Sequence, residues 1–327
     1  MDGDAGKART MKTVCVTGAG GFVASWLVQL LLSRGDYLVH GTVRDPSDPK
    51  NAHLMALDGA GERLRLFKAD LLDRASVAAA IAGCDGVFHV ASPVPAVEPT
   101  NPDVEVLAPA VTGTQNVLEA SRAANVRRVV VVSSVAAVIA NPNIPDGAVV
   151  DEDCWSDEDY CRATKNWYCV SKTVAEREAL AYGERTGMDV VTVCPPWVLG
   201  PLLQPTVNAT SMRFVAYLKG ENTDEKRRNM VDVRDVADAL VLTYETPEAS
   251  GRRYICSAHA MKVSETVGLV HSLHPDLKLH YPRKFVQMEY DRGVSSKRLL
   301  ALGWKFRAVE ETLRDTIDSY KAAGILN

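Results

Sequence analysis

The sequence has 327 residues, of which 46% are hydrophobic and 24% charged, and its formal net charge is −4. This composition is typical of a soluble globular protein and excludes a disordered or fibrous chain. With 37 basic against 41 acidic residues there is no basic surplus, so we expect no nucleic-acid partner.

The start of the chain, residues 1–10, is polar and charged, and we predict that it is disordered. It lacks the apolar core of a signal peptide, and the sequence shows no apolar run long enough for a transmembrane helix. We therefore expect a cytoplasmic protein with no membrane partner.

Strand and helix patterns alternate over the first two thirds of the chain. Apolar runs predict strands at 13–18, 37–43, 64–70, 86–92, 127–134 and 188–196. Helical spacing predicts intervening helices, notably at 21–35, 103–124 and 166–186. Strands that alternate with helices form right-handed crossovers, so we predict an α/β fold with a doubly wound parallel sheet of the Rossmann type.

The pattern loosens after Pro195, where proline and glycine become frequent. A helix is predicted at 231–245 and a further strand at 252–258. We predict a dinucleotide-binding domain over 11–195, to which 230–258 returns, and a smaller substrate-binding lobe over 196–327. The oligomeric state is left open.

The turn after the first strand reads TGAGGFVAS, with Gly18, Gly21 and Ala24 in a G-x-x-G-x-x-A pattern. Glycines let the backbone approach a pyrophosphate, and the N-terminus of the next helix favours its negative charge. Because this loop follows a predicted strand and opens a predicted helix, it predicts a dinucleotide site.

The second strand ends in GTVRDP, where many dinucleotide sites place an acidic residue for the adenosine 2′-hydroxyl. The Arg44 guanidinium would pair with a 2′-phosphate instead, and Lys50 follows in the same loop. We therefore predict NADP(H), with Arg44 as a plain surface charge as the alternative. Asp70 and Leu71 would meet the adenine edge, and residues 90–92 would form the floor under the cofactor.

The fifth strand ends in Ser133 and Ser134, at the sheet edge where ligands bind. Tyr168 and Lys172 lie four residues apart on a predicted helix and so share one face. A phenol, with a pKa of about 10, gives up its proton more easily beside an ammonium group. A serine hydroxyl can hold the substrate oxygen. The pattern indicates a Ser/Tyr/Lys triad.

The glycine loop, the paired serines and the Y-x-x-x-K pattern resemble the extended short-chain dehydrogenase/reductase superfamily. More narrowly, DEDCWSDEDYCRATKNWYCVSK is similar to the corresponding stretch of plant cinnamoyl-CoA reductases and their relatives, which include dihydroflavonol reductases. The resemblance implies that the catalytic residues are Ser134, Tyr168 and Lys172. It implies cofactor contacts at Thr17, Gly18, Gly20, Gly21, Phe22, Val23, Arg44, Lys50, Asp70, Leu71, Val90, Ala91, Ser92, Tyr168, Lys172, Pro195, Pro196, Trp197 and Val198.

The sequence departs from these relatives at positions associated with coenzyme A. A histidine and a lysine are replaced by Arg213 and Ala216, and the place of an arginine is taken by Lys262 and Val263. Substrate contacts are expected at Val135, Arg213, Tyr217, Lys262 and Phe285, although Tyr217 and Phe285 could equally be packing residues.

Three functions remain open from the sequence. The first is an NADPH-dependent reductase of a phenylpropanoid-type CoA thioester, which yields an aldehyde. The second is a reductase of a free aldehyde or ketone, of the phenylacetaldehyde, dihydroflavonol or tetraketide type. The third is a non-catalytic NADP-binding sensor, which the presence of the triad disfavours.

The sequence has seven histidines without metal-binding spacing, so we predict no metal. Its seven cysteines contain no C-x-x-C pair, which fits a reducing compartment. Cys154, Cys161 and Cys169 lie close to the predicted triad. They are either free thiols or include a redox-responsive Cys154–Cys161 disulfide.

Overall fold

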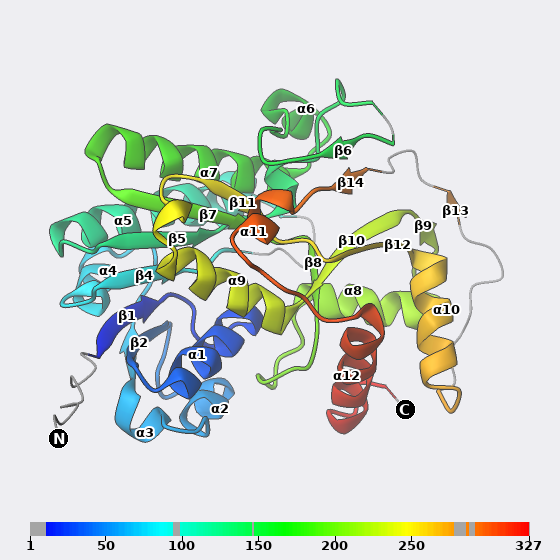
Figure 1. Cartoon of the computed structure of the whole chain (residues 1–327), viewed down its shortest axis with the longest axis horizontal. Helices are drawn as coiled ribbons and strands as arrows, with labels where there is room; N and C mark the ends of the chain where they lie inside the picture. Colours follow the sequence, from blue (N-terminus) through cyan, green and yellow to red (C-terminus); the bar gives the residue numbers. More distant parts are fainter. Residues whose placement is uncertain (1–10, 94–98, 146, 278–285, 288–291, 327) are drawn as a thin grey trace, which may run out of the picture.

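A computed structural model describes residues 11–93, 99–145, 147–277, 286–287 and 292–326. Its centre is a seven-stranded parallel sheet in the order β11-β7-β5-β4-β1-β2-β3 (Figure 1). These strands are β1 Lys12–Val16, β2 Tyr37–Val43, β3 Leu64–Lys68, β4 Gly86–His89, β5 Arg128–Val132, β7 Asp189–Cys194 and β11 Arg253–Ile255. The predicted doubly wound α/β fold is confirmed.

The chain runs outward from β1 to β3 and then crosses back to β4 on the other side of β1. This reversal leaves a crevice beyond the carboxyl ends of β1 and β4, which is where open α/β sheets bind ligands. Thr17 and Gly18 follow β1, and Ser133 and Ser134 follow β5. The predicted site residues therefore gather at one edge of the sheet.

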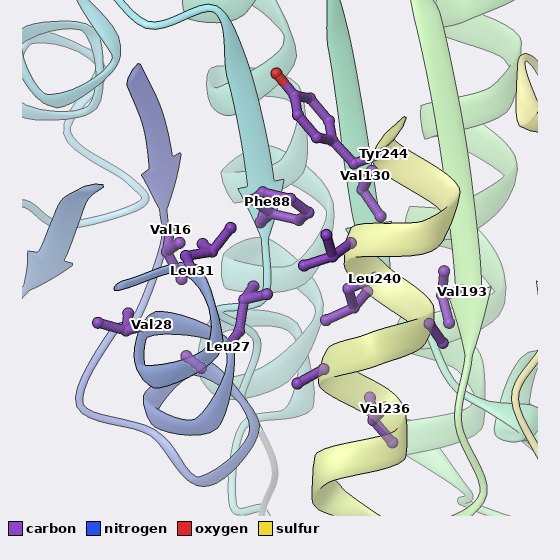
Figure 2. Packing of buried hydrophobic residues seen from close by; sticks show 14 of the residues in the cluster. Val16, Leu27, Val28, Leu31, Phe88, Val130, Val193, Val236, Leu240 and Tyr244 are labelled. Atoms are coloured by element: carbon purple, nitrogen blue, oxygen red, sulfur yellow. The ribbon is translucent and has the colours of Figure 1, made fainter. Parts of the chain in front are cut away.

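Helices cover both faces of the main sheet (Figure 1). On one face, α1 (Phe22–Arg34) packs beside α9 (Val233–Glu245), and their leucines and valines meet Phe88 and Val130 of the sheet (Figure 2). On the other face lie α4 (Arg74–Ile81), α5 (Ala108–Ala123) and α7 (Trp167–Thr186). Alternate residues of β1 serve both layers, because successive strand side chains point to opposite faces.

The helix α7 carries the predicted Tyr/Lys pair. It begins after Asn166, whose Oδ1 accepts a hydrogen bond from the Cys169 amide at 3.3 Å. It ends at Gly187, which has φ 73° in the left-handed region that glycine adopts without strain. These ends match the helix predicted at 166–186.

A second, three-stranded sheet lies beyond the main one, in the order β12-β10-β8. Its strands are β8 Trp197–Leu199, β10 Arg227–Asp232 and β12 His259–Lys262. A separate hydrophobic cluster joins it to α8 (Ala209–Leu218), α10 (Val263–Leu273) and α12 (Val309–Ala322). The sequence analysis did not foresee this sheet. The division of the chain into lobes at residue 195 stays a prediction.

The remaining elements are short. The helices are α2 Ala52–Met55, α3 Ala60–Arg63, α6 Glu158–Ala163 and α11 Lys297–Ala301, and the 3-10 and π turns are Pro49–Asn51, Asp103–Leu107, Val135–Ala137 and Pro247–Ala249. The strands are β6 Val149–Val150, β9 Asp224–Glu225, β13 Val286–Gln287 and β14 Gly293–Val294. Within the described ranges, no helix combines the length and the apolar character that crossing a bilayer requires.

Candidate active site

The glycine loop is shaped for close contact with a ligand. Gly18 has φ +66°, and a Cβ at this position would lie 2.9 Å from the Cβ of Ala91. A Cβ on Gly20 would lie 2.3 Å from Asn51 Oδ1. Gly21 caps α1 without any side-chain hydrogen bond, so the first-turn amides of the helix remain available to an anion. These features fit the pyrophosphate of a dinucleotide.

A buried hydrogen-bond chain holds this loop against β4. Thr17 Oγ1 accepts from the amides of Val90 and Ala91, each at 3.0 Å, and lies 3.0 Å from His89 Nδ1. Thr114 donates to Ala110 O at 2.6 Å and therefore accepts from His89 Nε2, at 3.1 Å. His89 Nδ1 must then accept from Thr17.

Burial lowers the pKa of His89 to about 3, so its ring is neutral and this single arrangement persists. The sequence analysis missed His89. Its signal was a histidine inside the otherwise apolar run GVFHVAS, in a strand that ends at the cofactor floor.

The residues predicted around the adenosine lie at the ends of β2 and β3. Arg44 directly follows β2 and is exposed. Lys50 Nζ pairs with Asp48 Oδ2 at 2.7 Å, so its charge is already compensated. Asp70 Oδ1 accepts from the Leu72 amide, and Leu71 packs against Gly113 of α5. Their contacts with a cofactor stay predictions.

The predicted triad is assembled at the edge of the sheet. The Ser134 side chain lies close enough to the Tyr168 hydroxyl to lower the pKa of Tyr168. Lys172 Nζ lies 6.0 Å from the centre of the Tyr168 ring and donates to Val132 O at 3.1 Å. Ser134 Oγ accepts from the Ala136 amide at 3.1 Å and lies 3.4 Å from Pro195 O. The chain's own fold therefore brings the three groups together.

Burial shifts the pKa values of Tyr168 and Lys172 in opposite directions. It raises the pKa of Tyr168 to about 12, which the hydrogen bond with Ser134 partly offsets. It lowers the pKa of Lys172 to about 8, an effect that the negative charge of Glu176 opposes. At neutral pH the phenol thus carries its proton, and the neighbouring amine is mostly charged.

We expect reduction by this protein to decline as the pH rises through about 8. Lys172 is charged below its pKa and neutral above it, and a neutral amine no longer favours proton release by Tyr168. The pKa of the Tyr168 phenol is about 12, so its titration cannot cause a decline of activity near pH 8. The measurement is kcat/KM against pH; a profile that stays flat far above 8 would contradict the assignment.

A small cavity adjoins the triad. It is lined by residues of the cofactor floor, of β5 and of α7, including His89, Ala91, Ser92, Ser133, Lys172 and Glu176. A larger cavity of about 590 Å³ lies between residues 153–159 and Arg177 and shares none of these lining residues. Of the predicted triad, Lys172 lines the small cavity, and no triad residue lines the larger one.

The expected substrate residues are only partly brought together. Tyr217 is fully buried in the cluster around α8, which agrees with the packing alternative. Val135 belongs to a different buried cluster, and Arg213 is exposed on α8. Lys262 pairs with Arg227 in the register of β10 and β12. Phe285 lies outside the described residues.

A basic group lies beside Trp197, which had been expected near the cofactor. The Arg228 guanidinium stacks on the rings of Trp197 and Tyr217, 5.4 and 5.8 Å from their centres. Burial lowers the pKa of Lys226, and the positive charges of Arg228 and Arg213 lower it further. In the part of the chain that the structure describes, none of these three cations has a carboxylate within 4.0 Å.

The cysteines of this region are free thiols. Cys154 Sγ lies 3.8 Å from Asp151 Oδ1, whereas Cys161 contacts Ala140 O and the Cys169 thiol. The structure therefore contains free Cys154 and Cys161 and no bond between them. Cys15, Cys194 and Cys256 are fully buried.

Comparisons with known proteins agree with this site. The model of the NAD-dependent epimerase/dehydratase family matches residues 14–256. Cinnamoyl-CoA reductase 2 of Medicago truncatula is 49% identical, over 96% of this chain and 93% of its own. Cinnamoyl-CoA reductase 1 of Petunia hybrida is 47% identical, over 96% and 94%.

Solved structures are similar over almost the whole chain. Vestitone reductase from alfalfa superimposes with a TM-score of 0.83 and 33% identity, over 95% of this chain and 99% of its own. The yeast methylglyoxal/isovaleraldehyde reductase Gre2, solved with NADPH, has a TM-score of 0.82 and 26% identity, over 95% and 99%.

Proposed function

Because this chain belongs to the NAD-dependent epimerase/dehydratase family, and within it to the cinnamoyl-CoA reductase-like proteins, we propose that it reduces hydroxycinnamoyl-CoA thioesters to aldehydes with NADPH. The observation that carries this proposal is the contact of Ser134 with Tyr168, one helical turn from Lys172, at the sheet edge beside the glycine loop. The chain is an NADP-dependent oxidoreductase, so the non-catalytic sensor is set aside.

The residues have distinct roles in this reaction. NADPH supplies the hydride that reaches the substrate carbonyl carbon. Ser134 orients the carbonyl oxygen, and Tyr168 donates its proton to that oxygen as negative charge develops. Lys172 would hold the nicotinamide ribose and, as an ammonium, would favour proton release from Tyr168. The hydride transfer would leave NADP⁺, and the tetrahedral adduct of a thioester would then lose its hydroxyl proton as the C–S bond breaks, giving an aldehyde and the protonated CoA thiol.

The basic group of Arg213, Lys226 and Arg228 supports a phosphate-bearing substrate. Burial and the charges of Arg228 and Arg213 lower the pKa of Lys226, and the negative charge of Asp224 offsets this only in part. A phosphate would relieve this repulsion and form charge-assisted hydrogen bonds. From the sequence alone, the basic cluster at 225–229 is interpreted as a solvated loop rather than a binding patch, since side-chain burial there depends on a sheet that the sequence did not predict.

The double variant Lys226→Gln/Arg213→Gln is expected to raise the KM for feruloyl-CoA by about 10-fold, because it removes two charge-assisted contacts. The KM for the matching free aldehyde should not change. Steady-state kinetics on both substrates measure this. The control variant, Lys305→Gln/Arg314→Gln, removes two exposed charges of the same part of the chain. Equal effects on thioester and aldehyde would exclude the basic group as a phosphate site.

The alternative substrate is a free aldehyde or ketone. The departures at Arg213, Ala216 and Lys262 favour it, and two solved relatives are named as reductases of vestitone and of methylglyoxal/isovaleraldehyde. With such a substrate the same proton and hydride transfers produce an alcohol, and no group leaves.

NADPH oxidation by the purified protein decides between the two substrates. Feruloyl-CoA and p-coumaroyl-CoA are compared with their free aldehydes and with a dihydroflavonol at saturating NADPH. Turnover of the thioesters supports the proposed function, and turnover of free carbonyls alone overturns it. A cytoplasmic location, and the absence of membrane and nucleic-acid partners, stay predictions.

A further inference from the structure

A buried carboxylate lies one helical turn beyond the catalytic lysine. Glu176 is only 1% exposed, on the α7 face that carries Lys172. Its Oε1 accepts from Thr192 Oγ1 at 2.6 Å and from Arg253 Nε at 2.8 Å. Its Oε2 accepts from Ser133 Oγ at 2.7 Å and from Arg253 Nη2 at 3.2 Å. Both oxygens are therefore fully used inside the protein.

The partner of this carboxylate comes from the far end of the main sheet. Arg253 opens β11, is 5% exposed, and also donates from Nη1 to the carbonyls of Glu152 and Cys154, at 2.8 and 2.9 Å. Its guanidinium stacks on Trp155, 3.5 Å from the ring centre. Arg253 thus ties the segment before the catalytic tyrosine to α7 and to the sheet.

The anchored serine lies between two groups of the triad. Ser133 precedes Ser134, whose hydroxyl contacts Tyr168, and follows Val132, whose carbonyl accepts from Lys172 Nζ. The Ser133 amide donates to Val193 O at 2.8 Å, and its hydroxyl is held by Glu176. A shift of Ser133 would therefore displace the contacts of both Ser134 and Lys172.

We propose that Glu176, in its buried ion pair with Arg253, is a positioning residue for the triad. It fixes the end of β5 through Ser133 and balances the charge behind Lys172. This inference rests on the reductase function proposed above.

The charges around Lys172 determine how a change at Glu176 would be detected. The titratable groups that face it are His89 from β4, Cys194 from β7, and Tyr168 and Glu176 from α7, and Arg253 of β11 is the ion-pair partner of Glu176. Burial lowers the pKa of His89 and raises those of Cys194 and Tyr168, so these three are neutral near pH 7. Only Glu176 and Arg253 carry charge, with opposite signs.

Replacing Glu176 by glutamine removes the negative charge that raises the pKa of Lys172, and it leaves the positive charge of Arg253 uncompensated. Like charges disfavour each other, so the pKa of Lys172 should fall further below its usual value. The alkaline limb of activity should move to lower pH by roughly one unit. The displaced serine contacts should also reduce kcat by about 10-fold or more, since small misplacements of catalytic groups are costly.

The experiment compares Glu176→Gln with Glu178→Gln, a variant with the same change on the same helix in a surface ion pair with Arg185. Both are assayed for kcat, for KM of NADPH and for kcat/KM against pH. We expect the full effect in Glu176→Gln, with KM for NADPH within about 3-fold of the unsubstituted protein. If Glu176→Gln lowered only the Tm, with normal kcat and no change in the pH at which kcat/KM declines, Glu176 would have a structural role alone.

A double variant covers the case in which Glu176→Gln does not fold. Glu176→Met/Arg253→Met removes both buried charges together, and such apolar replacements of an ion pair are often tolerated. Its alkaline decline in activity should still lie at lower pH than that of the unsubstituted protein, because the Glu176 charge is absent, and kcat should stay low, because Ser133 remains unanchored. Recovery of full kcat would overturn the positioning role.

NADPH binding, followed by its fluorescence at a series of pH values, provides a readout that needs no turnover. It reports on Lys172 because this residue is proposed to hold the nicotinamide ribose. If the unsubstituted protein reduces none of the tested carbonyls, the reductase proposal fails by itself. A shift in the pH at which NADPH affinity declines in Glu176→Gln would still support the role of Glu176, and an unchanged pH dependence would contradict it.

Discussion

Replacement of Tyr168 by phenylalanine is expected to lower kcat by about 10³-fold, within the range found for general acids. The phenol is the proposed proton donor, and its pKa of about 12 keeps it protonated over the working pH range. Phenylalanine keeps the ring and its packing but has no proton to give. The measurement is kcat with saturating substrate, together with NADPH binding, which should remain nearly unchanged because the ring itself is retained.

Tyr182→Phe is the matched control for this variant. Tyr182 lies on the same helix, α7, and is 8% exposed, but it lies more than two helical turns beyond Lys172. It should leave kcat within about 2-fold, as a substitution away from the chemistry does. If Tyr168→Phe retained full activity, Tyr168 would not be the acid, and the mechanism proposed above would be wrong.

Replacement of Arg44 by aspartate is expected to reverse the cofactor preference. The guanidinium is exposed at the carboxyl end of β2, where it can pair with a 2′-phosphate. A carboxylate at this position repels that phosphate and accepts the 2′-hydroxyl of NADH instead. We expect kcat/KM for NADPH to fall by about 100-fold and that for NADH to rise, which corresponds to a loss of about 2.7 kcal/mol for NADPH.

Arg65→Asp provides the control for Arg44→Asp, since Arg65 is exposed on the neighbouring strand β3. It makes the same change in net charge and should preserve the preference for NADPH. Lys50→Gln should have a smaller effect than Arg44→Asp, because Lys50 is already paired with Asp48. An unchanged ratio of NADPH to NADH activity in Arg44→Asp would identify Arg44 as a plain surface charge.

Local patterns in the sequence were sufficient to predict the main sheet and the shared helix face of Tyr168 and Lys172. Buried parallel strands are continuous runs of valine and leucine, and a spacing of four places Tyr168 and Lys172 on one face of a helix. The glycine loop was equally predictable, because the turn requires a positive φ and Gly18 is the residue type that adopts it without strain. These features depend on neighbours a few residues away.

Other features depend on residues far apart in the chain. Glu176 and Arg253 are separated by 77 positions, and nothing near either residue indicates their ion pair. The sheet of β8, β10 and β12 joins short segments with little periodicity, so it escaped prediction. As a result Tyr217, expected near a substrate, is fully buried in the core of that region.

The late position of β11 in the chain has a consequence for recombination between relatives. A chimera joined at residue 195 would inherit α7 from one parent and β11 from the other. The guanidinium at position 253 would then come from one parent, whereas Glu176 and the segment of Glu152, Cys154 and Trp155 that it contacts would come from the other. A chimera made to exchange substrate specificity would therefore have to take both Glu176 and Arg253 from one parent. The segment to be exchanged is then not one continuous stretch of sequence.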